Sequence, residues 1–178
     1  HAPLPTMGQR FFMSRRRSPR RGRLHAMQEP PLSTLLVADD HPLFRAALIQ
    51  LLRERFAQCQ TLEAASAPTL RVALEEHPEI ELVLLDLAMP GARGFSSLLH
   101  VRGEYPQVPV VVISSNEHPR VIRRAQQFGA AGFIPKSAAA EDMAAAIQTV
   151  LDGGISFPPM AAERSQADAE LAAKLAQL

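Results

Sequence analysis

The sequence contains a single cysteine, Cys59, and no tryptophan. One cysteine cannot form a disulfide within the chain, and it excludes a metal site built from several thiolates. No apolar run approaches the roughly 20 residues that a membrane-spanning helix needs. The first 30 residues also lack the apolar central segment of a secretory signal. We therefore expect a cytoplasmic chain without membrane contact.

Acidic residues are missing from positions 1–23, which hold seven arginines. The rest of the chain carries 12 basic and 18 acidic residues, so the overall net charge of +1 hides an acidic body. Residues 1–32 are rich in Arg, Pro, Gly and Ser, which predicts a disordered basic arm. The arm would bind nucleic acid or an acidic surface nonspecifically, or it is a solvated tail, the interpretation that we favour.

The segment 82–87 is apolar except for Asp86, and the Met-Pro-Gly sequence at 89–91 stops it. A short apolar run before turn residues is typical of a buried strand in a parallel sheet. Open α/β sheets bind their ligands in a crevice at the carboxyl ends of the strands. Asp86 is therefore predicted to lie at the reaction centre.

Five strand-like segments alternate with five helical ones along the chain. This alternation predicts an α/β fold, a flavodoxin-like doubly wound parallel sheet of order 2-1-3-4-5 with helices on both faces. Pro135 in the fifth strand indicates an edge position, because a central strand needs the backbone N–H. The expected strands are 34–40, 59–65, 82–86, 108–113 and 131–135, and the expected helices are 41–55, 66–77, 95–103, 119–129 and 137–152.

Local signals predict where several helices begin and end. His41 and Pro42 open the first helix, and we interpret His41 as a helix-start residue rather than a metal ligand or phosphate carrier. Leu43 is expected on the apolar face of that helix. Ser137 is expected to cap the last helix. The single Cys59 is interpreted as a small buried apolar residue.

The predicted strand order brings Asp39, Asp40 and Asp86 to one place. Three carboxylates repel one another unless a cation lies among them, and oxygen ligands of this kind suit Mg²⁺. Ser114 and Lys136 follow the fourth and fifth strands and add a hydroxyl and a fixed positive charge. These are the parts of a phosphoryl-transfer site, where catalysis is mostly positioning and charge stabilisation.

Four motifs in this order resemble a response-regulator receiver domain of the NarL/FixJ (LuxR-type) subfamily. They are Val-Ala-Asp-Asp-His-Pro-Leu-Phe-Arg at 37–45, Asp-Leu-Ala-Met-Pro-Gly at 86–91, Val-Ile-Ser at 112–114 and Gly-Phe-Ile-Pro-Lys-Ser at 132–137. The resemblance covers residues 33–158. Each motif alone is weak, and their order at successive strand ends makes the match specific.

The resemblance implies a role for each matching residue. Asp86 would be the phosphoacceptor, and Ser114 and Lys136 would bind the phosphoryl oxygens. Asp39, Asp40, Asp86 and the backbone carbonyl of Ala88 would hold Mg²⁺. Phe133 would be the aromatic switch residue, although it lacks the hydroxyl of a tyrosine.

The resemblance also implies a function in two-component signalling. A sensor histidine kinase would phosphorylate the domain, which is not otherwise an enzyme, and phosphorylation would promote a homodimer. Residues 159–178 would be a linker helix, truncated before a helix-turn-helix output domain that binds DNA and regulates transcription, or the frayed end of a single-domain regulator. A pseudo-receiver binding module and an aspartyl-phosphate phosphatase remain as alternatives. The phosphatase pattern has its nucleophile on the first strand, whereas the acceptor expected here, Asp86, lies on the third strand. This difference argues against the phosphatase.

Overall fold

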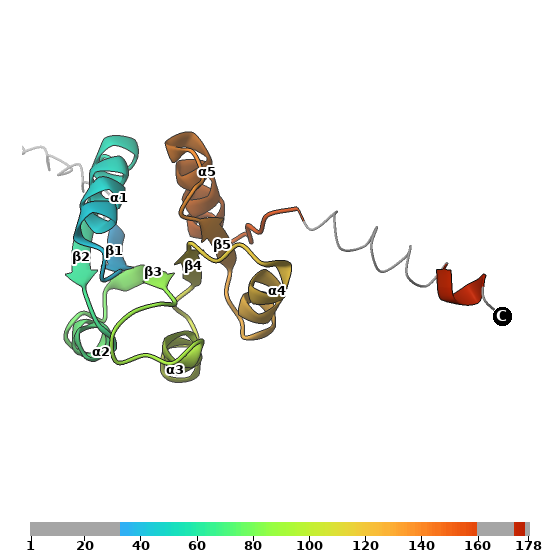
Figure 1. Cartoon of the computed structure of the whole chain (residues 1–178). Helices are drawn as coiled ribbons and strands as arrows, with labels where there is room; N and C mark the ends of the chain where they lie inside the picture. Colours follow the sequence, from blue (N-terminus) through green and yellow to red (C-terminus); the bar gives the residue numbers. More distant parts are fainter. Residues whose placement is uncertain (1–32, 160–172, 177–178) are drawn as a thin grey trace, which may run out of the picture.

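The computed structural model describes residues 33–159 and 173–176, and within residues 33–159 five strands alternate with five helices (Figure 1). In chain order these are β1 (Ser33–Ala38), α1 (Pro42–Arg55), β2 (Cys59–Ala64), α2 (Ala67–Glu76), β3 (Ile80–Asp86), α3 (Ser96–Glu104), β4 (Val110–Ser114), α4 (Pro119–Gln127), β5 (Gly132–Pro135) and α5 (Ala140–Leu151).

The five strands form one parallel sheet in the order β2-β1-β3-β4-β5, which confirms the predicted fold class. Helices α1 and α5 cover one face of this sheet, and α2, α3 and α4 cover the other (Figure 1). The order of the strands reverses between β1 and β3, so the carboxyl ends of these two neighbours lie at the switch point.

Alternate residues of the central strands supply two separate cores. Residues such as Leu36, Val83 and Val112 pack on the side of α2, α3 and α4, whereas Leu35, Leu84 and Val111 pack on the side of α1 and α5. This alternation follows from the two-residue period of a strand. Strands buried on both faces explain the uninterrupted apolar runs in the sequence.

Helix ends follow the sequence signals in some places and depart from them in others. Ser66 caps α2 in a reciprocal capping box with Thr69, as the serine there predicts. The expectation for Ser137 is wrong, because α5 begins at Ala140 with Ala139 as its N-cap, and the Ser137 hydroxyl donates to Glu117 instead.

Leu43 does not join the apolar face of α1, and its side chain is 88% exposed. The buried residues of this helix are Leu48, Ile49, Leu51 and Leu52. At 100° per residue, Leu43 points away from the centre of that group. The prediction that Leu43 lies on the apolar face is therefore wrong, and Ala47, the next expected member of that face, is exposed as well.

Strand β5 lies at the edge of the sheet, as Pro135 predicts. Its outer side is paired with the segment that follows α5: Phe133 N–H donates to the Ser156 carbonyl at 2.9 Å, and Ser156 N–H donates to the Ala131 carbonyl at 3.0 Å. A Cβ atom on Gly132 would lie 2.9 Å from the Ser156 carbonyl oxygen, so this close pairing requires glycine.

The predicted basic arm, residues 1–32, and most of the predicted linker helix lie outside the described residues.

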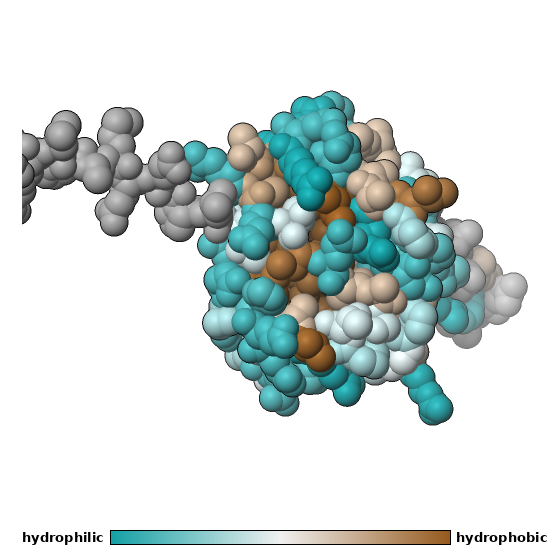
Figure 2. Space-filling model, turned by 90° about the vertical axis from the view of Figure 1, so that its left-hand side faces the viewer, coloured by the Kyte–Doolittle hydropathy of each residue, from teal (hydrophilic) through white to brown (hydrophobic). Residues whose placement is uncertain are grey.

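Figure 2 shows the molecule from the side of the β2 edge, where a few hydrophobic residues gather within a largely hydrophilic surface. Across residues 33–159 and 173–176, every helix is too short or too polar to cross a membrane.

Candidate functional site

Three carboxylates meet at the carboxyl ends of β1 and β3. Asp39 follows β1 directly, Asp86 is the last residue of β3, and Ala38 pairs with Leu85 just before them. Asp39 and Asp86 are each only 2% exposed. Asp40 is half-buried beside them, so the sequence prediction that these acids converge is confirmed.

Lys136 brings a positive charge into this acidic cluster. Its Nζ atom lies 2.7 Å from Asp39 Oδ2 and 3.1 Å from Asp86 Oδ2, and its side chain is 13% exposed. The Phe44 ring lies 4.8 Å from Nζ, measured to the ring centroid, and adds a cation–π contact. One ammonium partly neutralises two buried carboxylates, which leaves the cluster with a net negative charge.

The sheet itself places Lys136 at this position. Lys136 directly follows β5, and its backbone N–H donates to the Ser114 carbonyl at 2.9 Å, at the end of β4. β4 therefore separates Lys136 from Asp86 in the sheet, and the long lysine side chain spans that gap. The ends of β1, β3 and β5 therefore place Asp39, Asp86 and Lys136 together at one edge of the sheet.

Two backbone N–H groups fix the carboxylates of Asp39 and Asp86, and one arginine fixes the backbone at the end of β1. His41 N–H donates to Asp39 Oδ1 at 2.7 Å, and Ala88 N–H donates to Asp86 Oδ1 at 3.1 Å. Arg45 donates to the Asp39 carbonyl at 2.5 Å and to Glu63 at 2.7 Å, which ties the end of β1 to β2. These contacts orient the acids before any ligand binds.

The donor set fits a divalent cation. Asp39, Asp40, His41 and Asp86 each offer one ligand atom, and these atoms lie within 4.8 Å of one another. Asp39 Oδ2 and Asp40 Oδ1 are buried and accept no hydrogen bond from any described residue. The 2.7 Å contact between Asp39 Oδ2 and Lys136 is therefore an ion pair without hydrogen-bond geometry. Buried, poorly satisfied carboxylate oxygens favour a bound cation.

Ser114 and Phe133 occupy the positions that the sequence assigns to them. Ser114 ends β4 and is buried, and its hydroxyl accepts a hydrogen bond from Asn116 N–H at 3.1 Å. Phe133 is buried in the core that includes Ile122 and Ala125 of α4. Phe133 thus shares a core with α4, the helix that follows Ser114.

Sequence reasoning missed the place of the His41 imidazole. Its Nδ1 atom lies 3.1 Å from Asp39 Oδ1, 3.1 Å from Asp40 Oδ1 and 3.5 Å from Asp86 Oδ2. His41 does start α1 as its N-cap, but its side chain makes no capping hydrogen bond. The available signal was that His41 directly follows Asp39 and Asp40, because consecutive residues just after a strand lie at the same end of that strand.

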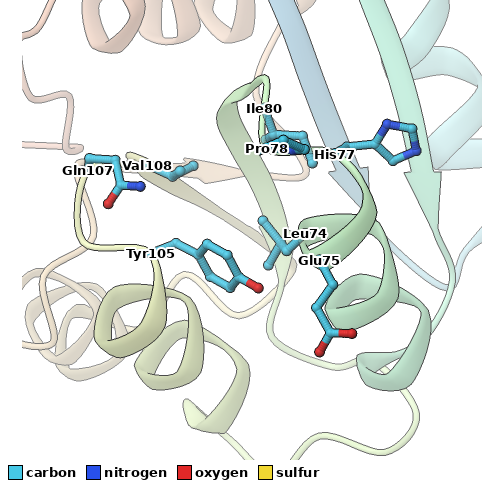
Figure 3. Close-up of a pocket in the computed structure, with 8 residues that line it drawn as sticks. All are labelled: Leu74, Glu75, His77, Pro78, Ile80, Tyr105, Gln107 and Val108. Atoms are coloured by element: carbon cyan, nitrogen blue, oxygen red, sulfur yellow. The ribbon is translucent and has the colours of Figure 1, made fainter.

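A separate pocket of about 370 Å³ lies at the opposite end of the sheet (Figure 3). Leu74, Ile80, Tyr105 and Val108 are among the residues that line it. Ile80 is the first residue of β3 and Asp86 is the last, so the pocket and the acidic cluster lie at opposite ends of this strand. The histidine of this pocket, His77, shares a hydrogen bond of 2.9 Å with Glu79. Among the described residues, the pocket holds no group of three metal-binding side chains, so the acidic cluster is the better site.

Cys59 is half-buried, so the prediction of a buried apolar residue is only partly met. Burial raises the pKa of its thiol above the ordinary value, and the positive charge of Arg53 opposes this effect weakly. The Sγ atom lies 3.7 Å from the Leu52 carbonyl. A thiol with a raised pKa, remote from the acidic cluster, suits packing better than redox chemistry.

Comparisons with known proteins agree with this arrangement. Residues 35–148 match the family model described as response regulator receiver domain. The chain is 38% identical over 125 residues to the glycerol metabolism activator of Pseudomonas putida, which covers 70% of this chain and 57% of that protein. It is 32% identical over 126 residues to the nitrate/nitrite response regulator NarL of Escherichia coli, covering 71% and 57%.

A solved structure, a LuxR family DNA-binding response regulator from Silicibacter pomeroyi, is similar with a TM-score of 0.64 and 32% identity. The match covers 73% of this chain and 99% of that one. The chain spans about three-fifths of the length of the curated relatives that it matches, with 57%, 61% and 55% for three of them. The family match at residues 35–148 includes the acidic cluster and Lys136.

Proposed function

Because this chain belongs to the response regulator receiver domain family, and to its NarL/FixJ type, we propose that Asp86 accepts a phosphoryl group from the phosphohistidine of a sensor histidine kinase. The observation that carries the proposal is the position of Asp86 between the Lys136 ammonium group and two further carboxylates. Lys136 Nζ lies 3.1 Å from Asp86 Oδ2, and Asp39 and Asp40 lie on the other side as partners for a divalent cation.

The chemistry is a transfer between two nucleophiles. An Asp86 carboxylate oxygen attacks phosphorus, the new O–P bond forms as the N–P bond of the phosphohistidine breaks, and the electron pair returns to the kinase imidazole. Asp86 Oδ1 is held by Ala88 N–H, and Lys136 lies at Oδ2, so both oxygens are oriented before transfer. Orientation of this kind is the main contribution that a protein makes to phosphoryl transfer.

A divalent cation, which we propose to be Mg²⁺, would bind Asp39, Asp40 and Asp86 with the Ala88 carbonyl, and it would offset the charge on the phosphoryl oxygens. Lys136 would pair with the same oxygens from the β5 side. Its ion pairs to Asp39 and Asp86 already keep its ammonium group inside the cleft.

Phosphorylation would then act as a switch. It adds about −1.5 to −2 charge and strong acceptor oxygens, to which the Ser114 hydroxyl and Lys136 donate. Drawing Ser114 toward Asp86 would break its contact with Asn116 N–H and move the segment that leads into α4. Phe133 packs in the core with α4, so its rotamer would follow that movement. A ligand shifts such an equilibrium only by its difference in affinity for the two states.

The output of this switch would be transcription regulation. Phosphorylation would promote a homodimer, and DNA would be bound only by an output domain that lies outside this sequence. Two of the similar proteins carry names that state transcription regulation or DNA binding. Access to a kinase and to DNA implies a cytoplasmic location. The chain would catalyse no reaction other than its own phosphorylation and dephosphorylation.

The proposal is tested by mixing the chain with Mg²⁺ and acetyl phosphate and following intact mass. We expect the mass of one phosphate to appear on the wild type and not on Asp86→Asn. Asp152→Asn is the matched control, because Asp152 is an exposed aspartate at the C-cap of α5. If neither acetyl phosphate nor beryllofluoride produces a complex, the chain is a binding module that is not phosphorylated.

A further inference from the structure

The His41 imidazole lies across the mouth of the acidic cluster with one nitrogen turned inward. The side chain is 61% exposed, yet Nδ1 is within 3.5 Å of an oxygen from each of Asp39, Asp40 and Asp86. Nδ1 is also 3.0 Å from Lys136 Nζ. Four charged side chains from the ends of β1, β3 and β5 thus converge on one imidazole nitrogen.

Starting the helix does not explain the position of this ring. The His41 carbonyl accepts the first helical hydrogen bond, from Arg45 N–H at 2.9 Å, and its backbone N–H donates to Asp39. The backbone alone therefore performs the helix-start role, and the ring makes no capping bond. By contrast, the His118 ring does cap α4, because its Nδ1 accepts from Arg120 N–H at 3.2 Å.

We infer that His41 Nδ1 is a metal ligand and that it gives the site an affinity for first-row transition cations, from Mn²⁺ to Zn²⁺, in addition to Mg²⁺. The inference rests on the proposed cation site and adds a nitrogen donor to it. Imidazole suits Zn²⁺, Ni²⁺ and Cu²⁺, whereas carboxylates and water suit Mg²⁺ and Mn²⁺. A site with both nitrogen and oxygen ligands therefore binds transition cations more tightly, relative to Mg²⁺, than a site with oxygen ligands alone.

The separations between donor atoms match a shared ion. Ligands about 2.0–2.2 Å from one ion lie roughly 3 to 3.5 Å from each other. Nδ1 lies 3.1 Å from Asp39 Oδ1, 3.1 Å from Asp40 Oδ1 and 3.5 Å from Asp86 Oδ2. The Asp40 Oδ1 atom that faces the ring is buried and accepts no hydrogen bond from any residue in the described part of the chain.

A cation at His41 Nδ1 replaces the hydrogen bond of 3.0 Å that this nitrogen shares with Lys136 Nζ, and Lys136 keeps its contact with Asp39 through the other carboxylate oxygen. Lys136 Nζ contacts Asp39 Oδ2, whereas His41 Nδ1 faces Asp39 Oδ1. Asp86 Oδ2 lies near both groups. The side of the cluster toward β1 is therefore the side where His41 supplies the nitrogen.

The experiment loads the full chain with Mn²⁺ and records electron spin echo envelope modulation. We expect nitrogen modulation from a bound imidazole in the wild type and its loss in His41→Asn, with Mn²⁺ still bound. His77→Asn is the matched control, because His77 also contacts a carboxylate, Glu79, at the opposite end of β3. That variant should keep the modulation.

Calorimetric titrations with Co²⁺, Zn²⁺ and Mg²⁺ give a second readout. His41→Asn should weaken Co²⁺ and Zn²⁺ binding by about tenfold or more and Mg²⁺ binding by less than about threefold. Mn²⁺ bound without nitrogen modulation, or modulation that survives in His41→Asn, would overturn the inference and leave the proposed receiver function standing. If neither Mn²⁺ nor Mg²⁺ binds the wild type, the proposed cation site itself fails.

Discussion

Lys136 Nζ lies 3.1 Å from Asp86 Oδ2, although the two residues come from strands that β4 separates. The lysine reaches the acid because it follows β5 at the same edge of the sheet. This pair joins the proposed phosphoacceptor to the strand that carries Phe133. Changes at either residue should therefore affect both the stability of the cleft and its chemistry.

Lys136→Met is expected to destabilise the fold in the absence of divalent cations. The variant leaves Asp39 and Asp86 as buried carboxylates without their ammonium partner, which should lower the free energy of unfolding by about 1–3 kcal/mol. Urea denaturation measures this change. The only other lysine, exposed Lys174, provides the control Lys174→Met, which should leave stability unchanged. Equal effects of the two variants would contradict the account.

Asp40→Asn is expected to stabilise the cation-free chain while weakening its response to Mg²⁺. Replacing one of three clustered carboxylates relieves like-charge repulsion, which should raise the free energy of unfolding by about 1 kcal/mol. In the wild type, Mg²⁺ at about a hundred times its Kd should add about 2.7 kcal/mol, and the variant should gain less at the same concentration. Unfolding curves with Mg²⁺ and with a chelator make the comparison. A variant as responsive as the wild type would remove Asp40 from the site.

Gly132→Ala is expected to separate β5 from the segment after α5. The new Cβ would lie 2.9 Å from the Ser156 carbonyl oxygen, a backbone atom with little freedom to move. We expect a loss of about 1–3 kcal/mol of unfolding free energy. Gly103 lies in α3, where a Cβ atom would meet no described atom within 4 Å, so Gly103→Ala should gain up to about 1 kcal/mol. Thermal unfolding of both variants should therefore shift in opposite directions.

Cys59 is expected to react slowly with iodoacetamide at neutral pH. Burial raises the pKa of this thiol, so the reactive thiolate is scarcer than in free cysteine. The rate should continue to rise with pH beyond about 8.5, the usual pKa of a free cysteine. The urea-unfolded chain serves as the reference. A rate that levels off below that pH would show that the thiol is activated rather than suppressed.

The strand order and the meeting of Asp39, Asp86 and Lys136 were predictable from the sequence. Parallel strands place their carboxyl ends at one edge, so residues directly after or at the ends of apolar runs must lie near each other. The capping serine of α2 was predictable for a similar reason, because Ser66 acts on its own first turn.

The errors concern side chains whose direction depends on an exact helix start. Ser137 lies before the N-cap of α5, so it contacts Glu117 instead of the helix. The His41 ring turns toward the carboxylates, and this choice of rotamer has no periodic signal in the sequence. Leu43 illustrates the same limit, since a shift of one position moves a helical residue by 100°.

Locating the acyl phosphate in the chain decides whether Asp86 is the phosphoacceptor. The chain is incubated with acetyl phosphate and Mg²⁺, reduced with borohydride, digested and sequenced by mass spectrometry, since borohydride converts an aspartyl phosphate into homoserine. We expect homoserine at position 86 and unchanged aspartate at positions 39 and 40. Homoserine at 39 or 40, or at no position, would show that Asp86 does not accept the phosphoryl group.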